Sequence, residues 1–381
     1  MANVFDMSCS LPVEILSTIL NGVQDANSLA SVCCNSRTLG GEAARILYRR
    51  VELTNRRMTD SFSETMVQSP ALGERVHTLF LTIEGSSVFE PSPEDTYPLA
   101  RILSSLPKLQ HLTIKSNLQS LPMGYAPIFE HCPFQLAAFH NFPLAFTDTM
   151  EFLSSQPNIQ GWTHLEPSEY AFMQNRSPPL DEQFLPRLLV VNIDAELLSA
   201  FRGSRPVTHA RLRIFEIDED ACHAFLRDLR YVRDTLVSLM IDASHSSCET
   251  SDIFFVERVA REVPSLKHFA LLDDNRSRIY EQDFSSDVFV DAISGFKNLV
   301  TFTYAPPKPN ALLRTPRGSI HPAASAMLDG SSTLRRVSIS QGGSIWACKP
   351  LPFDTYAKLP GGQIEEELNE PLDFESWRFL S

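Results

Sequence analysis

The residues that could carry out chemistry are few, and none of them forms a recognised catalytic pattern. The sequence contains no GxGxxG, GxxxxGK[ST], GxSxG, HExxH or CxxC motif, which are the usual marks of phosphate cradles, nucleophile elbows and zinc sites. Asp218-Glu219-Asp220 resembles a metal-binding cluster, but acidic residues just before a helix are explained by its dipole. His131-Cys132 lacks a second ligand pair at usable spacing. We therefore predict a non-catalytic protein with neither a cofactor nor a metal.

Two arginines are better suited to recognition than to catalysis. Arg211 and Arg213 are separated by one residue, so in a strand both side chains point to the same face of the sheet. Guanidinium groups bind carboxylates and phosphates in a bidentate manner. One interpretation is a basic pair that binds an acidic or phosphorylated segment, and the alternative is an ordinary solvated sheet face.

A recurring strand pattern must position these residues. The pattern L-x-x-L-x-L, with other apolar residues at some of its positions, recurs about every 29 residues, as in leucine-rich repeats. Strong copies span 76–81, 109–114, 188–193, 236–241, 266–271, 299–304 and 334–339, and weaker copies begin at Leu136, Ile159 and Val207.

The segments between the strands predict helices. Apolar residues fall at i, i+3, i+4 and i+7 in the windows 99–106, 222–229, 256–263 and 289–296, which is the spacing of one helix face. Proline follows several of these segments, at positions 107, 157, 186 and 264, where it ends a helix and favours extended geometry before it. The unit of helix, proline turn and strand predicts an α/β fold with a parallel sheet and outer helices.

Such a chain resembles a leucine-rich-repeat solenoid, and the resemblance implies an extended concave face for protein partners. The family's loop Asn or Cys is clear only at Asn117, so we expect irregular connections. Residues that flank the core positions should line the concave face, and the predicted substrate-binding residues are His111, Thr113, Asn192, Arg211, Arg213, Met240, His268 and Arg336.

The amino-terminal stretch has a different pattern. After Leu11-Pro12, apolar residues at 15, 16, 19 and 20 form one helical stripe. Asn21-Gly22 predicts the end of this helix, and two further short helices are expected before residue 53. Three short helices bury little core by themselves, so the stripe is expected to face a partner.

The pattern LPxEIL…IL…L…VC followed by AxxILYRxVxL resembles an F-box, the helical module that binds F-box proteins to the adaptor of cullin–RING ubiquitin ligases. The turn after the first helix is shorter than in the family, and Ser36 stands where an aromatic residue is preferred. The resemblance implies that the adaptor-binding residues are Leu11, Pro12, Ile15, Leu16, Ile19, Leu20, Val32 and Cys33.

Composition narrows the class of protein. A formal net charge of −13 argues against general binding to nucleic acid or anionic membranes. No apolar run reaches the length of a membrane span, and the start of the chain lacks a secretory signal. The seven cysteines are scattered, as is typical of reduced thiols, so we expect a cytoplasmic or nuclear protein.

Together these observations predict an F-box at 8–53, an irregular leucine-rich-repeat solenoid at 70–348 and an acidic tail or cap at 349–381. The predicted function is that of a substrate-recognition subunit of a Skp–cullin–F-box type ubiquitin ligase. Its partners would be the adaptor with the cullin complex and a protein substrate. The alternative is a leucine-rich-repeat interaction scaffold outside any ligase, whose amino-terminal helices only cap the first repeat.

Overall fold

The computed structural model of the chain describes most of the sequence with gaps. The described residues are 12–23, 25–35, 37–84, 93–116, 124–165, 181–198, 201, 203, 205–215, 219–245, 252–273, 286–305, 320–340 and 353–367. Residues 306–319, Leu11 and the end of the chain beyond residue 367 are outside them.

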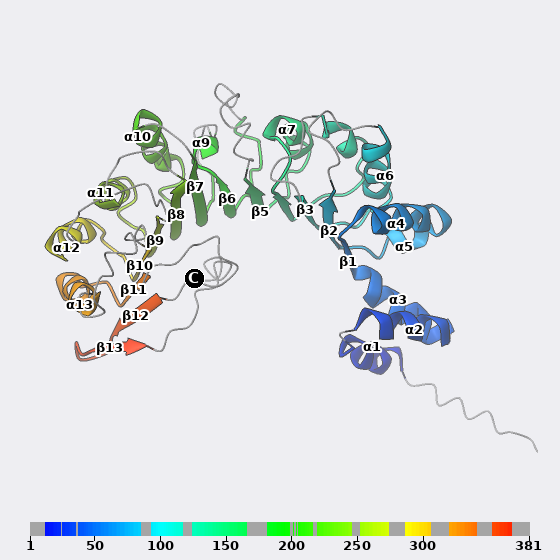
Figure 1. The fold of residues 1–381 in the computed structure, drawn as a ribbon, viewed down its shortest axis with the longest axis horizontal. Helices are drawn as coiled ribbons and strands as arrows, with labels where there is room; N and C mark the ends of the chain where they lie inside the picture. The colour runs from blue at the N-terminus through cyan, green and yellow to red at the C-terminus, as the bar shows by residue number, and fades with distance from the viewer. Residues whose placement is uncertain are drawn as a thin grey trace, which may run out of the picture. The chain divides into compact units, whose positions relative to one another are not determined.

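Helices and strands alternate along most of the described chain (Figure 1). The helices are α1 (Val13–Asn21), α2 (Ala26–Asn35), α3 (Arg37–Arg49), α4 (Arg56–Gln68), α5 (Pro70–Gly73), α6 (Pro93–Ser104), η1 (Ala126–Phe129), α7 (Phe146–Ser154), α9 (Ala195–Leu198), α10 (Glu219–Asp228), η2 (Leu229–Tyr231), α11 (Asp252–Glu262), α12 (Ser286–Ser294) and α13 (Ile320–Gly330). The strands are β1 (Arg50–Leu53), β2 (Thr78–Ile83), β3 (His111–Ser116), β4 (Ala138–Asn141), β5 (Gly161–His164), β6 (Val190–Asp194), β7 (His209–Phe215), β8 (Ser238–His245), β9 (His268–Leu272), β10 (Thr301–Ala305), β11 (Arg336–Ser340), β12 (Phe353–Lys358) and β13 (Ile364–Glu367).

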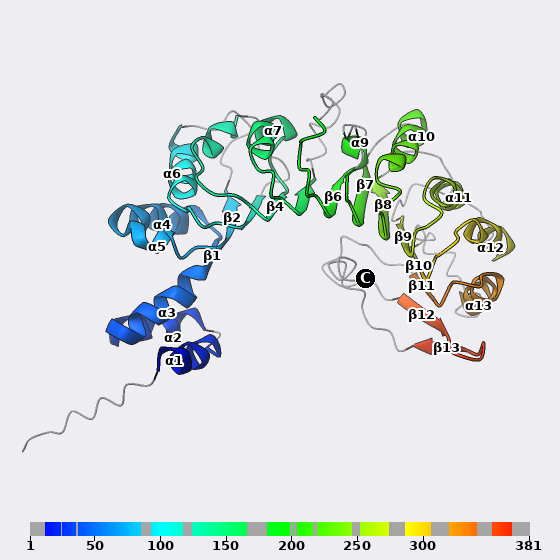
Figure 2. The same cartoon turned by 180° about the vertical axis from the view of Figure 1, so that it is seen from behind.

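The chain divides into two compact units, Met1–Phe152 and Leu153–Ser381. In the first, β1 to β4 pair in sequence order and in parallel. In the second, β5 to β11 do the same, and β12 and β13 follow in antiparallel pairing. Helices α10 to α13 lie along one face of the second sheet, as both views show (Figure 2). The predicted α/β class with a mostly parallel sheet is confirmed, and the boundary between the units lies inside the predicted 70–348 domain.

Every copy of the strand pattern forms a strand, and each strand begins at the third residue of its copy. The first apolar residue therefore lies just before the strand and is buried: Val76 and Leu136 are 0% exposed, and Leu109 is 1% exposed. Within β2, burial alternates along the strand, as expected when one face of the sheet packs on helices. In each unit the pattern therefore places the first apolar residue of these copies in the core.

The four predicted helical windows coincide with α6, α10, α11 and α12. Their apolar stripes are buried; Ile102, Leu226 and Val259, for example, are each 0% exposed. Helix α6 ends at Ser104 and α11 at Glu262, each shortly before a proline, because proline has no N–H to continue the helical ladder.

Three strands were not predicted. Residues 50–53 were assigned to the helical module, but they form β1 and pair with β2. In the predicted tail or cap, β12 and β13 form a hairpin on β11. Gly361 and Gly362 form its turn with φ of 112° and 88°, which glycine adopts without a Cβ penalty. The sequence did not predict β13, because three of its four residues are glutamates, at positions 365–367.

His164, at the end of β5, makes the stability of the second unit depend on pH. Its ring is fully buried, and burial, with a further effect of the Arg213 charge, lowers its pKa to about 3. The folded state keeps the ring neutral, whereas the unfolded chain takes up a proton below about 6.5. The contribution of the neutral ring to the free energy of unfolding is therefore fully present above that pH, and it is lost as the pH drops toward 3.

We expect the free energy of unfolding to decrease by about 2 kcal/mol between pH 7 and pH 5 through His164 alone. Urea unfolding of the wild-type chain and of His164→Phe at the two pH values measures this effect, since phenylalanine does not titrate. An equal pH dependence in both proteins would contradict the assignment.

Candidate functional site

Helices α1, α2 and α3 form a small module with a core of its own. Leu20, Leu29 and Ala43, one from each helix, are buried together. Partly buried side chains pack against this cluster, namely Val23, Val32, Cys33, Ile46 and Leu47. The module thus closes its core without using every apolar residue of α1.

Two isoleucines of α1 lie outside that core. Ile15 is 47% exposed and Ile19 is 55% exposed, and residues four apart are neighbours on one helix face. Leu16, beside them, is half-buried. Because both side chains are already about half buried, covering the rest of them with a partner is worth about 1.5–3 kcal/mol in total. The face formed by Ile15 and Ile19, called the α1 face below, can therefore support a specific contact.

The structure corrects part of the predicted adaptor surface. Leu20 is 5% exposed and belongs to the module's own core, so the prediction that it faces a partner is wrong. Val32 and Cys33 are half-buried and pack on the same core. Pro12 is exposed and lies just before α1, where its carbonyl accepts bonds from the N–H groups of Ile15 and Leu16 at 3.0 and 3.1 Å. Leu11 is outside the described residues.

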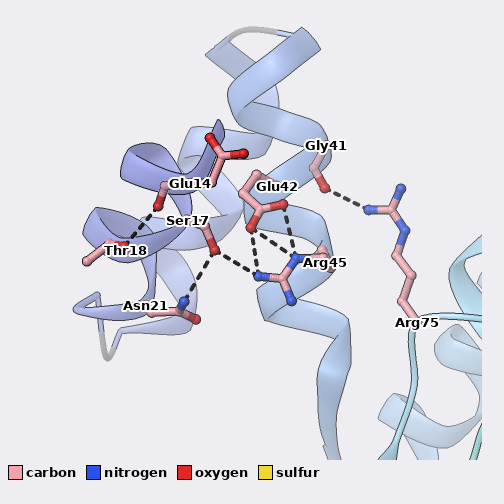
Figure 3. A network of polar contacts seen from close by, with 8 residues as sticks. All are labelled: Glu14, Ser17, Thr18, Asn21, Gly41, Glu42, Arg45 and Arg75. Carbon is pink, nitrogen blue, oxygen red and sulfur yellow. Dashed lines mark hydrogen bonds and ion pairs between the residues drawn. The ribbon is translucent and has the colours of Figure 1, made fainter. Parts of the chain in front are cut away.

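A polar network fixes α1 on α3 (Figure 3). Arg45 is held by Glu42 through N–O distances of 2.7–3.0 Å, and its Nη2 also donates to the Ser17 hydroxyl at 3.1 Å. The bond from Arg45 lowers the pKa of the Glu42 carboxyl group, so the carboxylate form persists. Ser17 is two residues from both Ile15 and Ile19, which places it on the opposite side of the helix. Anchoring Ser17 to α3 thus turns the α1 face outward.

The module is also attached to the first strands. Helix α3 ends at Arg49 and β1 begins at the next residue. Arg75, just before β2, donates from Nη1 to the carbonyl oxygen of Gly41 at 2.8 Å (Figure 3). The three helices are therefore joined to the first unit by continuous chain and by a side-chain contact.

The predicted substrate-binding residues lie on the sheet side opposite the helices, which we call the helix-free face. In the first unit His111 is exposed, and in the second unit Arg336 is exposed and His268 is half-buried. The ring of His268 is hydrogen-bonded to the Thr301 hydroxyl at 2.9 Å, and burial is the main cause that lowers its pKa.

Three of the predicted contact residues do not present a surface. Thr113 is 7% exposed, and Asn192 and Met240 are each 5% exposed. Met240 belongs to an apolar cluster with Leu272, Ala305 and Phe353. The prediction that these side chains contact a partner is wrong, because Thr113 is buried on β3 of the first unit and Asn192 and Met240 are buried on the sheet of the second unit.

The predicted basic pair is neutralised within the sheet. Arg213 of β7 forms bonds of 2.6 and 3.0 Å to Asp194 of β6, and Arg211 bonds Asp242 of β8 at 2.8 Å. Asp194 aligns with Arg213 in the register of β6 and β7, and Asp242 lies on β8 two residues beyond Met240, the register partner of Arg211. The interpretation of Arg211 and Arg213 as a basic site for an acidic or phosphorylated segment is therefore wrong.

Arg50 is a surface residue that the sequence pattern missed. It lies on β1, at the register of Thr78 and His111, and it is exposed. The alternation of Arg50-Val51-Glu52-Leu53 was a strand signal, but four residues are too few to separate it from the end of a helix.

Comparison with family models and with curated proteins finds no match for this chain. No helix among the described residues is long and apolar enough to cross a membrane. Within the same residues, no group of three or more His, Cys, Asp and Glu side chains is arranged to hold a metal ion.

Proposed function

We propose that this chain is a substrate-recognition subunit of a Skp–cullin–F-box type ubiquitin ligase. In this proposal the three-helix module is an F-box that binds the adaptor, and the remaining units are degenerate leucine-rich repeats that hold a protein substrate. The chain would have no catalytic role of its own and would act by proximity and orientation.

The outward position of Ile15 and Ile19 is the observation that carries the proposal. The core of the module is closed by other side chains, so these two residues are not needed to build it. Two exposed isoleucines on one helix face suit a partner that covers them. The motif that suggested an adaptor contact includes both residues.

A second candidate is a repeat scaffold in which the helices only cap the first strand. The attachment of α3 to β1 and the contact between Arg75 and Gly41 favour it, since a cap needs such contacts and no external partner.

Mixing the purified chain with a purified ligase adaptor separates the two candidates. The ligase proposal expects a one-to-one complex in size-exclusion chromatography, with a dissociation constant below about 1 μM, which corresponds to about 8 kcal/mol. No complex at tenfold higher concentration would favour the cap.

A further inference from the structure

The helix-free face of the first unit carries two cations of a different kind from Arg211 and Arg213. The guanidinium carbon of exposed Arg50 lies 4.5 Å from the centre of the Phe80 ring. The ammonium nitrogen of exposed Lys115 lies 5.9 Å from the centre of the Phe142 ring. In the described part of the chain, neither cation has a carboxylate within ion-pair distance.

The cations on the helix-free face have different surroundings in the two units. There, both arginines of β7 are paired with aspartates of β6 and β8, and their side chains are 14–17% exposed. In the first unit the cations rest on aromatic rings, which hold a side chain in place by cation–π attraction without cancelling its charge. Arg50 and Lys115 can therefore be positioned and still attract an anion.

The other titratable groups on this face do not reverse its sign. Among the described residues of β1 to β4, Glu52, exposed on β1, is the carboxylate of the face, and His111 and His140 are the histidines. Glu84, just past β2, accepts a hydrogen bond from the backbone N–H of Arg56 at the start of α4 at 3.0 Å. Two cations against one carboxylate leave the face positive, while the whole chain has a net charge of −13. A positive face on an acidic protein favours an acidic partner over a basic one.

The strand register sets the distance between the two cations. Arg50 aligns with Thr78 and Thr78 with His111, and Lys115 lies four residues further along β3. The Cα atoms of Arg50 and Lys115 are therefore separated by two strand spacings across the sheet and four residues along it, which is about 16 Å. An extended peptide covers that distance in about five residues.

We propose that the helix-free face of β1–β3 binds an extended segment of a protein substrate with glutamate or aspartate side chains about five residues apart. The proposal rests on the proposed function in that this segment would belong to the ligase substrate. One carboxylate would bind Arg50 beside the Phe80 ring, and the second would bind Lys115 beside Phe142. The half-buried Phe80 ring supplies an apolar contact for the residues between them.

Fluorescence anisotropy with labelled Gly/Ser peptides tests the proposal on the full chain. The probe carries two Glu-Glu pairs about five residues apart, and the comparison peptides carry Gln-Gln, Glu-Glu pairs about two residues apart, or phosphoserine at the same places. We expect the probe to bind more tightly than the glutamine and short-spacing peptides. Arg50→Gln and Lys115→Gln should each weaken probe binding by about threefold, and by about tenfold together.

Arg57→Gln is the matched control, because Arg57 is exposed on α4 rather than on the sheet, and it should leave probe binding unchanged. An equal loss in Arg57→Gln, or no loss in the double variant, would overturn the proposal. So would binding of the phosphoserine peptide alone, since the assignment is to carboxylates.

Adaptor binding by the same variants separates this proposal from the ligase function. A double variant that forms the adaptor complex normally while losing probe binding supports both. Normal adaptor binding in a wild-type chain that does not bind the probe overturns the peptide assignment alone. Probe binding in a chain that never binds the adaptor overturns only the ligase function.

Discussion

Replacing Ile15 and Ile19 together by aspartate is expected to weaken adaptor binding by more than about a hundredfold. The change removes two apolar contacts worth about 1.5–3 kcal/mol in total and places two charges in an interface that excludes water. Each 1.4 kcal/mol corresponds to about a tenfold change in affinity. Titration of the adaptor against both proteins by calorimetry measures the loss.

The fold should survive this double substitution. Both side chains are about half exposed, so aspartate at these positions stays in water in the unbound chain. Leu16 is half-buried, and Leu16→Asp would combine a binding effect with a local stability effect. The thermal midpoint of the double variant should lie within a few degrees of the wild-type value.

Val67→Asp is the matched control for exposed apolar surface. Val67 lies on α4 and is 56% exposed, close to the 55% of Ile19. The Val67→Asp variant should bind the adaptor with the affinity of the wild-type chain. If the α1 variant bound normally, or if Val67→Asp lost as much affinity, the α1 face would not be the docking surface.

Gly40→Ala is expected to destabilise the three-helix module by about 2 kcal/mol. A Cβ at residue 40 would lie 2.6 Å from the carbonyl oxygen of Cys33 in α2, well inside van der Waals contact. The obstacle is backbone, so α2 and α3 must move apart and loosen the core around Leu29 and Ala43. Hydrogen exchange of the α2 and α3 amides should become faster.

The adjacent glycine provides the control. A Cβ at Gly41 meets no atom within 4 Å, and alanine favours a helix over glycine by about 0.5–1 kcal/mol. Gly41→Ala should therefore slow exchange of the same amides. Adaptor affinity should fall in Gly40→Ala and be kept in Gly41→Ala, because the α1 face depends on how α1 packs on α3. Equal exchange rates in the two variants would contradict this packing argument.

Much of the fold could be predicted from sequence because its rules are local. The ten strands follow from the spacing of apolar residues, and the helix ends follow from proline. Local rules failed for β1, β12 and β13. These strands are defined by the partner strands that supply their hydrogen bonds, and not by their own pattern.

The candidate sites, too, were determined partly by the sequence and partly by the tertiary structure. The sequence by itself determined that α1 has an apolar stripe and that Arg211 and Arg213 share one face. Only the tertiary structure decided that Ile19 points outward and Leu20 inward, because the packing of Ser17 and Arg45 sets the rotation of the helix. It likewise brought Asp194 and Asp242, 19 and 31 residues away, beside the two arginines. Charge pairing between strands depends on register across the sheet, and register joins residues that no local pattern connects.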